Sequence, residues 1–254
     1  MQFYGDKICV LCLKKNFNAS FQDNFKQFVN PIEYEIIEGV KNPINEGHVN
    51  VNLWQILNHT TTDPVSCDIF RNHLSIIRKY FQEGARTVFI MEEDARFPDM
   101  NANRMAVWEK ANQWMKVNET KWDIFYFGYC CWPVLASFWT TNNIVRLPTP
   151  LCAHAYVMNR SGMEKVLNYL EGPDFQNSIH IDKLYVKIPN MRKYGCFPML
   201  SYQEQSPALY VKACDILNKD VTFKSFCQFN ERLCLSIPFI FLALFFIILF
   251  RYLK

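Results

Sequence analysis

The chain has 254 residues, enough for one sizeable domain or two small ones. Half of the residues are hydrophobic and 20% are charged, a composition that excludes an intrinsically disordered chain, a collagen-like repeat and a small disulfide scaffold. The 27 basic and 24 acidic residues nearly balance, whereas a nucleic-acid-binding domain usually carries a basic surface. We therefore expect a hydrophobic core and no nucleic-acid partner.

The first strong signals in the chain are a strand and a long helix. Residues 8–13 form a continuous apolar run that predicts a buried strand. Asp63 and Pro64 supply an N-cap and a first-turn proline for a helix in which apolar residues recur every three or four positions until Gly84. Weaker signals between them predict a helical segment over 21–28, a strand over 34–37 and a helical turn over 51–57.

Strands and helices then alternate. Residues 87–91 (TVFIM) are apolar throughout, which is typical of a strand covered on both faces of a mostly parallel sheet. The alternation predicts an α/β domain with crossover helices. The further elements, in chain order, are a helix over 103–115, a strand over 122–128, a hairpin up to Pro150, a strand over 153–158, a helix capped by Ser161 through 170, a helix over 181–188 and a strand over 196–200.

The end of the chain differs from the rest. Residues 233–250 are 18 consecutive uncharged residues, and a helix of that length rises about 27 Å, close to the hydrocarbon thickness of a thin bilayer. A buried core helix is the alternative, but such a helix keeps a polar side and this segment has none. We expect a globular domain over 1–232, a single transmembrane anchor over 233–250 and a short basic tail over 251–254.

The topology follows from the two ends of the chain. The first residues, with charges close on both sides of a short apolar run, predict a strand and not a secretory signal. A carboxy-terminal span without a leader predicts a tail-anchored membrane protein whose large domain is cytosolic, with most of its 10 cysteines reduced. Four Asn-x-Ser/Thr triplets argue for a lumenal domain, although such triplets often arise by chance; they begin at Asn18, Asn58, Asn118 and Asn159.

An acidic cluster follows the strand predicted over 87–91. Glu92, Glu93 and Asp94 are consecutive, and like charges so close together raise one another's pKa unless a cation lies among them. Ligands in open α/β sheets bind at the carboxyl ends of the strands, where this cluster lies. Oxygen ligands favour Mg²⁺ or Mn²⁺, which usually keep waters and bridge to substrate phosphates. The alternative is a solvated turn that only ends the strand.

Two further segments hold candidate site residues. His154 and Tyr156 lie on the same side of the strand predicted over 153–158, although a histidine in an apolar strand is more often a hydrogen-bonded core residue than a ligand. Asp182 follows His180 after a Gly-Pro-Asp turn, and by itself an aspartate at the start of an element is a helix cap.

The order of these segments resembles the family 25 glycosyltransferases, the group of lipopolysaccharide and procollagen galactosyltransferases. The opening stretch ICVLCLKKN is similar to the family's first strand, and the resemblance extends from residue 8 to about residue 209. Four more blocks in the family's order make it specific. They are CDIFRNHLSIIRKYFQEGARTVFIMEEDARF, which is similar to the Ser-His helix and the Glu-Asp-Asp strand, WDIFYFG, CAHAYVMNRSGMEKVL and HIDKLYV.

The resemblance implies a GT-A-like fold with a mostly parallel sheet, a nucleotide-sugar donor, in particular a UDP-sugar carrying galactose or glucose, and a hydroxyl acceptor on a glycan, lipid or protein. Glu93 replaces the middle aspartate of the Glu-Asp-Asp motif and reaches one methylene further, so Asp94 is the better candidate ligand for Mn²⁺ or Mg²⁺. Asn72 replaces the serine of Ser-His. The residues carried over or added are Asp94 and Glu93 for the metal, His73, Asn72, Tyr156 and His154 for the donor, and Asp182 and Glu92 for catalysis.

The implied reaction places a divalent ion on the departing diphosphate. Inversion at the sugar carbon requires a general base for the acceptor hydroxyl and no covalent nucleophile, and Asp182 is the candidate base. Trp132, Trp139 and Tyr156 are candidate sugar-stacking residues. The alternative function is a transferase fold that has lost catalysis and acts as a membrane-anchored binding module, an interpretation that the changes at Glu93 and Asn72 keep open.

Overall fold

The computed structural model describes residues 3–12, 34–39, 64–97, 102–129, 143–172, 180–196 and 199–203. The chain forms two compact units, Met1–Ser201 and Tyr202–Lys254. Of the second unit only the short strand β9 (Tyr202–Gln203) is described. The helix expected over 21–28, the turn over 51–57 and the boundary at residue 232 lie outside the described residues.

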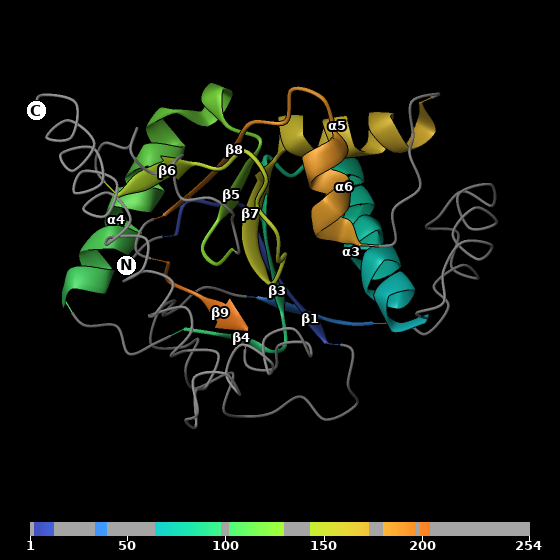
Figure 1. Ribbon diagram of the computed structural model, residues 1–254, viewed down its shortest axis with the longest axis horizontal. Coiled ribbons are helices and arrows are strands. Elements are labelled where there is room, and N and C mark those ends of the chain that lie inside the picture. Colours follow the sequence, from blue (N-terminus) through green and yellow to red (C-terminus); the bar gives the residue numbers. More distant parts are fainter. Residues whose placement is uncertain are drawn as a thin grey trace, which may run out of the picture. The chain divides into compact units, whose positions relative to one another are not determined.

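The first unit is built on a seven-stranded sheet with the order β2-β1-β3-β7-β5-β8-β6 (Figure 1). The central strands are apolar and buried along almost their whole length, as their β-branched and aromatic composition predicts. The strands are β1 (Lys7–Cys12), β2 (Glu35–Glu38), β3 (Thr87–Glu92), β5 (Ile124–Tyr126), β6 (Ile144–Arg146), β7 (Ala155–Asn159) and β8 (Lys193–Cys196), and a two-residue strand β4 (Ala95–Arg96) follows β3 outside this sheet.

The sheet is mixed, so the prediction of a mostly parallel sheet is wrong. β1 pairs in parallel with β2 and β3, and β5 pairs in parallel with β8. β7, however, runs antiparallel to both β3 and β5, and β6 runs antiparallel to β8. The apolar runs correctly indicated burial on both faces, but helices on both faces impose the same composition on a strand of either direction.

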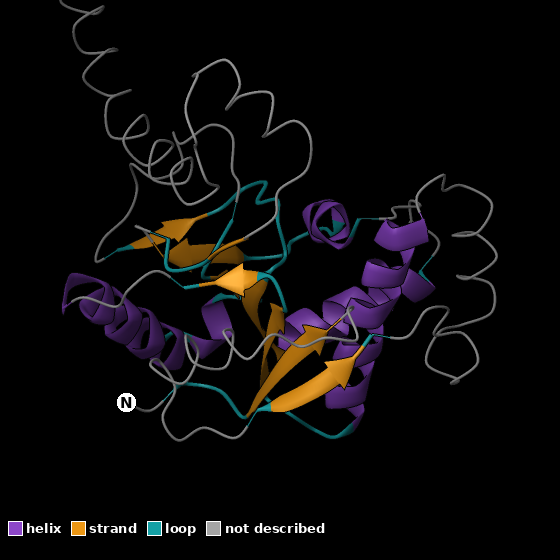
Figure 2. Cartoon of the chain, turned by 90° about the horizontal axis from the view of Figure 1, so that it is seen from below, coloured by secondary structure: helices purple, strands orange, loops and turns teal. Residues whose placement is uncertain are grey.

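Helices cover both faces of the sheet, and Figures 1 and 2 show them on opposite sides. Side chains of β1 and β3 alternate between two buried clusters, so that Cys9 and Val88 face one layer and Ile8 and Phe89 the other. The first layer contains α3 (Pro64–Gln82), α5 (Arg160–Glu171) and α6 (Ile181–Lys187), and the second contains α4 (Ala102–Val117), which is followed by the 3-10 turn η2 (Glu119–Lys121).

The local signals for the helices were largely correct. α3 begins at Pro64, as the proline predicted, and ends two residues before Gly84, which adopts a left-handed φ of 79°. The cap of α5 differs from the prediction, because the side chain of Asn159 accepts the hydrogen bond from the Gly162 amide. Asn159 is 3% exposed, so its glycosylation triplet is not accessible in the folded unit.

The predicted fold class also included a transmembrane helix. Across the described ranges, no helix combines the length and the apolar composition needed to cross a membrane. Residues 233–250, on which that prediction rested, are not among the described residues. The fold class is therefore corrected to an α/β unit with a mixed sheet.

Candidate functional site

The acidic cluster lies at the carboxyl end of β3, where the sheet register fixes the position of Glu92. Glu92 pairs with Leu11 of β1 on one side, and its backbone N–H donates to the carbonyl of His154 at 2.9 Å on the other. The next amide, of Glu93, donates to the Leu11 carbonyl at 3.0 Å. The Glu92 side chain is only 13% exposed, so the cluster is not a turn splayed into solvent.

His73 of α3 holds the Glu92 carboxylate. Nε2 of His73 lies 3.0 Å from Oε1 of Glu92, and Nδ1 lies 2.9 Å from the hydroxyl of Tyr156 on β7. Both the His73 and Tyr156 side chains are fully buried. The apolar spacing of α3 packs its other residues against the sheet, and His73 shares that buried face, so its polar atoms meet side chains of the sheet and not water. Tyr156 therefore contacts His73 inside the core, and its ring has no free face for stacking a sugar.

Asp182 lies on α6, where two backbone N–H groups hold its carboxylate. One carboxylate oxygen accepts from the Cys152 backbone N–H at 3.0 Å and the other from the Lys183 N–H at 2.7 Å. Cys152 has a φ of 70°, in the left-handed region that non-glycine residues seldom adopt. One turn further along α6, the Tyr185 hydroxyl lies 2.7 Å from the Tyr156 hydroxyl. The backbone around Cys152 thus fixes Asp182 beside the buried tyrosines.

Asp94, in the turn after β3, is a poorly compensated carboxylate. Its Oδ1 is buried and has no hydrogen-bond partner among the described residues. Burial raises the pKa of Asp94 to about 7, with a further contribution from the negative charge of Glu92. The Arg96 charge and a hydrogen bond from the backbone N–H of Asp94 itself oppose this only in part. The Arg96 guanidinium instead donates to the Glu93 and Ala95 carbonyls, which stabilises the turn.

His154 of β7 lies against Gly128, which follows β5. A methyl group at Gly128 would lie 2.2 Å from Nε2 of His154, so only glycine leaves room for this ring. His154 is 1% exposed, and neither ring nitrogen has a hydrogen-bond partner among the described residues. Burial lowers the pKa of His154, although the Glu92 charge and the nearby Ser201 backbone carbonyl oppose the shift. The His154 imidazole is therefore buried next to Glu92 and the Ser201 backbone.

The fit of a divalent ion depends on the carboxylates. In the described segments, no group of three or more His, Cys, Asp and Glu side chains is arranged to hold a metal. The negative charge of Glu92 contributes more than that of Glu93 to the raised pKa of Asp94. Two carboxylates, one with an unpaired oxygen, fit Mg²⁺ or Mn²⁺ in a site completed by waters and substrate phosphates, but not a closed protein cage.

Other predicted residues are placed differently. Asn72 is buried, and its side-chain amide donates to the Asp68 carbonyl one turn earlier on α3, so it is engaged on its own helix. Trp132 and Trp139 lie outside the described residues. Sequence reasoning missed Tyr185, for which the only signal was its position three residues after Asp182 in a short helix.

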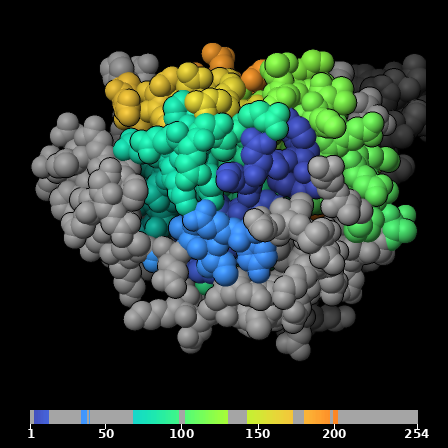
Figure 3. Space-filling model, turned by 180° about the vertical axis from the view of Figure 1, so that it is seen from behind, coloured from blue at the N-terminus to red at the C-terminus, as the bar shows by residue number. Residues whose placement is uncertain are grey.

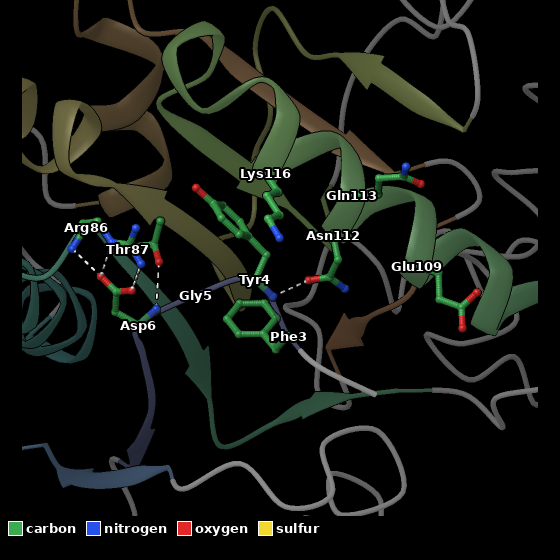
Figure 4. Close-up of a pocket in the computed structure, with 10 residues that line it drawn as sticks. All are labelled: Phe3, Tyr4, Gly5, Asp6, Arg86, Thr87, Glu109, Asn112, Gln113 and Lys116. Carbon is green, nitrogen blue, oxygen red and sulfur yellow. Dashed lines mark hydrogen bonds and ion pairs between the residues drawn. The ribbon is translucent and has the colours of Figure 1, made fainter.

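A cavity of about 460 Å³ lies at the other end of the sheet. Figure 3 shows residues 3–12 in dark blue between the teal segment 64–97 and the green segment 102–129, the three segments that line it. In Figure 4 the Asp6 carboxylate is bound by Arg86, and the Tyr4 amide donates to Asn112. Thr87, at the start of β3, lines the cavity and is separated from Glu92 by about 17 Å of strand. The cavity is thus distinct from the acidic cluster.

Similarity to known proteins does not identify a family for this chain. No family model matches the chain, and no curated protein matches it. Among solved structures, the crystal structure of A197 from STIV is similar to 79% of this chain over 87% of its own length, at 13% sequence identity and a TM-score of 0.39. A similarity this distant indicates neither a family nor a function.

Proposed function

We propose that this chain is a metal-dependent glycosyltransferase that moves a hexose, galactose or glucose, from a UDP-sugar to an acceptor hydroxyl on a glycan, lipid or protein, with inversion. The proposal is supported by the resemblance of the sequence blocks to family 25 and by the positions of the residues carried over from it. His73, Glu92 and Tyr156, which lie far apart in the sequence, share one hydrogen-bonded cluster at the carboxyl end of β3.

The observation that carries the proposal is the unpaired oxygen of Asp94. A buried carboxylate costs free energy unless it is paired, and Asp94 instead lies close enough to Glu92 for the two charges to repel. Carboxylates with strongly raised pKa values cluster at functional sites, and a bound cation would remove this cost. Glu92 and Asp94 would hold Mn²⁺ or Mg²⁺, and the bound ion would neutralise charge on the leaving nucleoside diphosphate.

The remaining residues supply orientation and proton transfer. His73 hydrogen-bonds one Glu92 oxygen and so fixes the orientation of that carboxylate. The two backbone N–H groups that Asp182 accepts fix its carboxylate, and each oxygen retains a lone pair for the proton of the acceptor hydroxyl. No covalent intermediate is needed, because in an inverting reaction the acceptor oxygen attacks the sugar carbon directly.

The test is a transfer assay with the full chain, Mn²⁺ and a panel of UDP-sugars. Wild type should transfer or hydrolyse at least one donor, and Asp94→Asn should lower that rate by about a hundredfold or more. Glu164→Gln, which removes an exposed carboxylate from α5, is the control and should leave the rate unchanged. Equal rates in Asp94→Asn and wild type would remove the metal assignment. Absence of both donor binding and turnover across the panel would favour the non-catalytic binding module.

A further inference from the structure

Four side chains form one continuous hydrogen-bonded network that begins at Glu92 of the acidic cluster. Glu92 lies 3.0 Å from His73, His73 lies 2.9 Å from Tyr156, and Tyr156 lies 2.7 Å from Tyr185. The three inner residues are fully buried and come from α3, β7 and α6. Their rings also pack together. His73 stacks on Tyr156 with ring centroids 5.8 Å apart, and Tyr185 meets Tyr156 edge-on with centroids 5.5 Å apart. This hydrogen-bonded network therefore connects α3 and α6 to the end of β3.

The directions of these hydrogen bonds follow from the Glu92 carboxylate at one end of the network. An ionised Glu92 can only accept, so Nε2 of His73 must donate to it. In a neutral imidazole Nδ1 is then an acceptor, and Tyr156 donates its proton to Nδ1. The Tyr156 oxygen in turn accepts from the Tyr185 hydroxyl. Every proton is used once in this arrangement, whereas the other neutral tautomer would turn a lone pair of His73 toward the carboxylate.

The hydrogen-bonded network also connects the candidate general base with the candidate metal site of the proposed reaction. Tyr185 lies three residues after Asp182, and positions three apart lie on neighbouring parts of one helix face. Glu92 is at the leaving-group end because it belongs, with Asp94, to the acidic cluster at the carboxyl end of β3. Side chains that hydrogen-bond a metal-binding carboxylate or its histidine partner usually affect metal affinity about 10- to 100-fold.

We propose that Tyr156 and Tyr185 are positioning residues that fix His73 in its Nε2–H tautomer and so hold the Glu92 carboxylate in the orientation that binds the divalent ion. The consequence for metal binding rests on the proposed function, but the tautomer of His73 is a property of the protein alone. Tyr156 acts directly on His73, and Tyr185 acts through Tyr156.

Tyr126 is a matched control for Tyr156 and Tyr185. Its ring lies 6.0 Å from that of Tyr156 and is fully buried in the same layer, but its hydroxyl has no hydrogen-bond partner among the described residues. Replacement of Tyr126 by phenylalanine removes the same atom as Tyr156→Phe or Tyr185→Phe from the same environment. An effect on His73 that depends on the hydrogen-bonded network must therefore be absent from Tyr126→Phe.

The experiment is ¹⁵N NMR of the histidine rings in the labelled full chain at one neutral pH, with the His73 signals assigned by their loss in His73→Gln. Wild type and Tyr126→Phe should show a protonated Nε2 and an unprotonated Nδ1. Tyr156→Phe should lose this pattern and Tyr185→Phe should weaken it. An Nδ1–H or a doubly protonated His73 in wild type, or an unchanged His73 in both variants, would overturn the proposal.

A Mn²⁺ titration of the same proteins separates this proposal from the proposed function. Affinity should fall about 10- to 100-fold in Tyr156→Phe, less in Tyr185→Phe and not at all in Tyr126→Phe. Wild type that shows the expected tautomer but binds no Mn²⁺ would contradict the proposed function and leave the positioning of His73 intact. Equal Mn²⁺ affinity in all four proteins would contradict the positioning role.

Discussion

Asp123 and Asp94 are two aspartates next to buried strands, and they are paired very differently. The Asp123 side chain is fully buried just before β5, yet it accepts hydrogen bonds from Arg192, Lys165 and Ser161. Burial by itself would raise the pKa of Asp123, but the bonds from Arg192 and Lys165 outweigh it and lower the pKa to about 2. Asp94 has one buried oxygen without such a partner, and its pKa is raised to about 7.

The difference separates a structural carboxylate from a candidate binding group. Asp123 brings together α5 and the segment before β8, so its charge stabilises the folded unit. Asp94 destabilises the unit on its own, because its charged form loses water and meets the Glu92 charge. A residue that costs stability without a ligand is best explained by a ligand that removes the cost.

The largest expected effect is a difference between two isosteric substitutions. Asp123→Asn leaves Arg192 and Lys165 without their carboxylate and should lower the free energy of unfolding by about 3 kcal/mol. Asp94→Asn removes a repulsive charge and should raise it by about 1 kcal/mol at neutral pH. Urea unfolding followed by circular dichroism measures both. Similar losses of stability in the two variants would contradict the comparison.

The next effect is the pH dependence of stability, which has opposite signs for the two groups. The folded pKa of Asp123 lies below the value of about 3.9 for an unfolded chain, so its contribution of about 2 kcal/mol is complete above pH 4 and is lost as the pH falls toward 2. The folded pKa of Asp94 lies above that value, so wild type should lose stability as the pH rises from about 4 through 7.

Comparison with Asp94→Asn isolates the second contribution. The difference in urea midpoint between this variant and wild type should grow from pH 5 to pH 8, and addition of Mn²⁺ should reduce it. A difference that stays constant over that range would show that Asp94 ionises in the folded chain as it does in water.

The smallest effect concerns a single hydrogen bond to Asp123. Ser161→Ala removes the hydroxyl that donates to Asp123 at 3.0 Å and should cost about 1 kcal/mol. Ser75→Ala is the control, because the Ser75 hydroxyl donates to a backbone carbonyl of its own helix and its loss should change stability by less than about 0.5 kcal/mol. Chemical denaturation of both variants tests this; equal effects would mean that the Asp123 cluster adds nothing specific.

The sequence predicted these regions unequally. β3 and α3 could be predicted because their signals are local: an apolar run that ends in acids, and a proline followed by residues at helical spacing. The direction of β7 could not, because burial on both faces gives the same composition in parallel and antiparallel strands. The contacts of Asp123 with Arg192 and of Tyr156 with Tyr185 join residues far apart in the chain, and no spacing rule connects them.

The most direct test of the account is calorimetric titration of the full chain with Mn²⁺ in the presence of UDP. The account predicts binding by wild type and Glu164→Gln and at least a tenfold weaker binding by Asp94→Asn, because the unpaired oxygen of Asp94 is the proposed ligand. The same affinity in Asp94→Asn and wild type would contradict it.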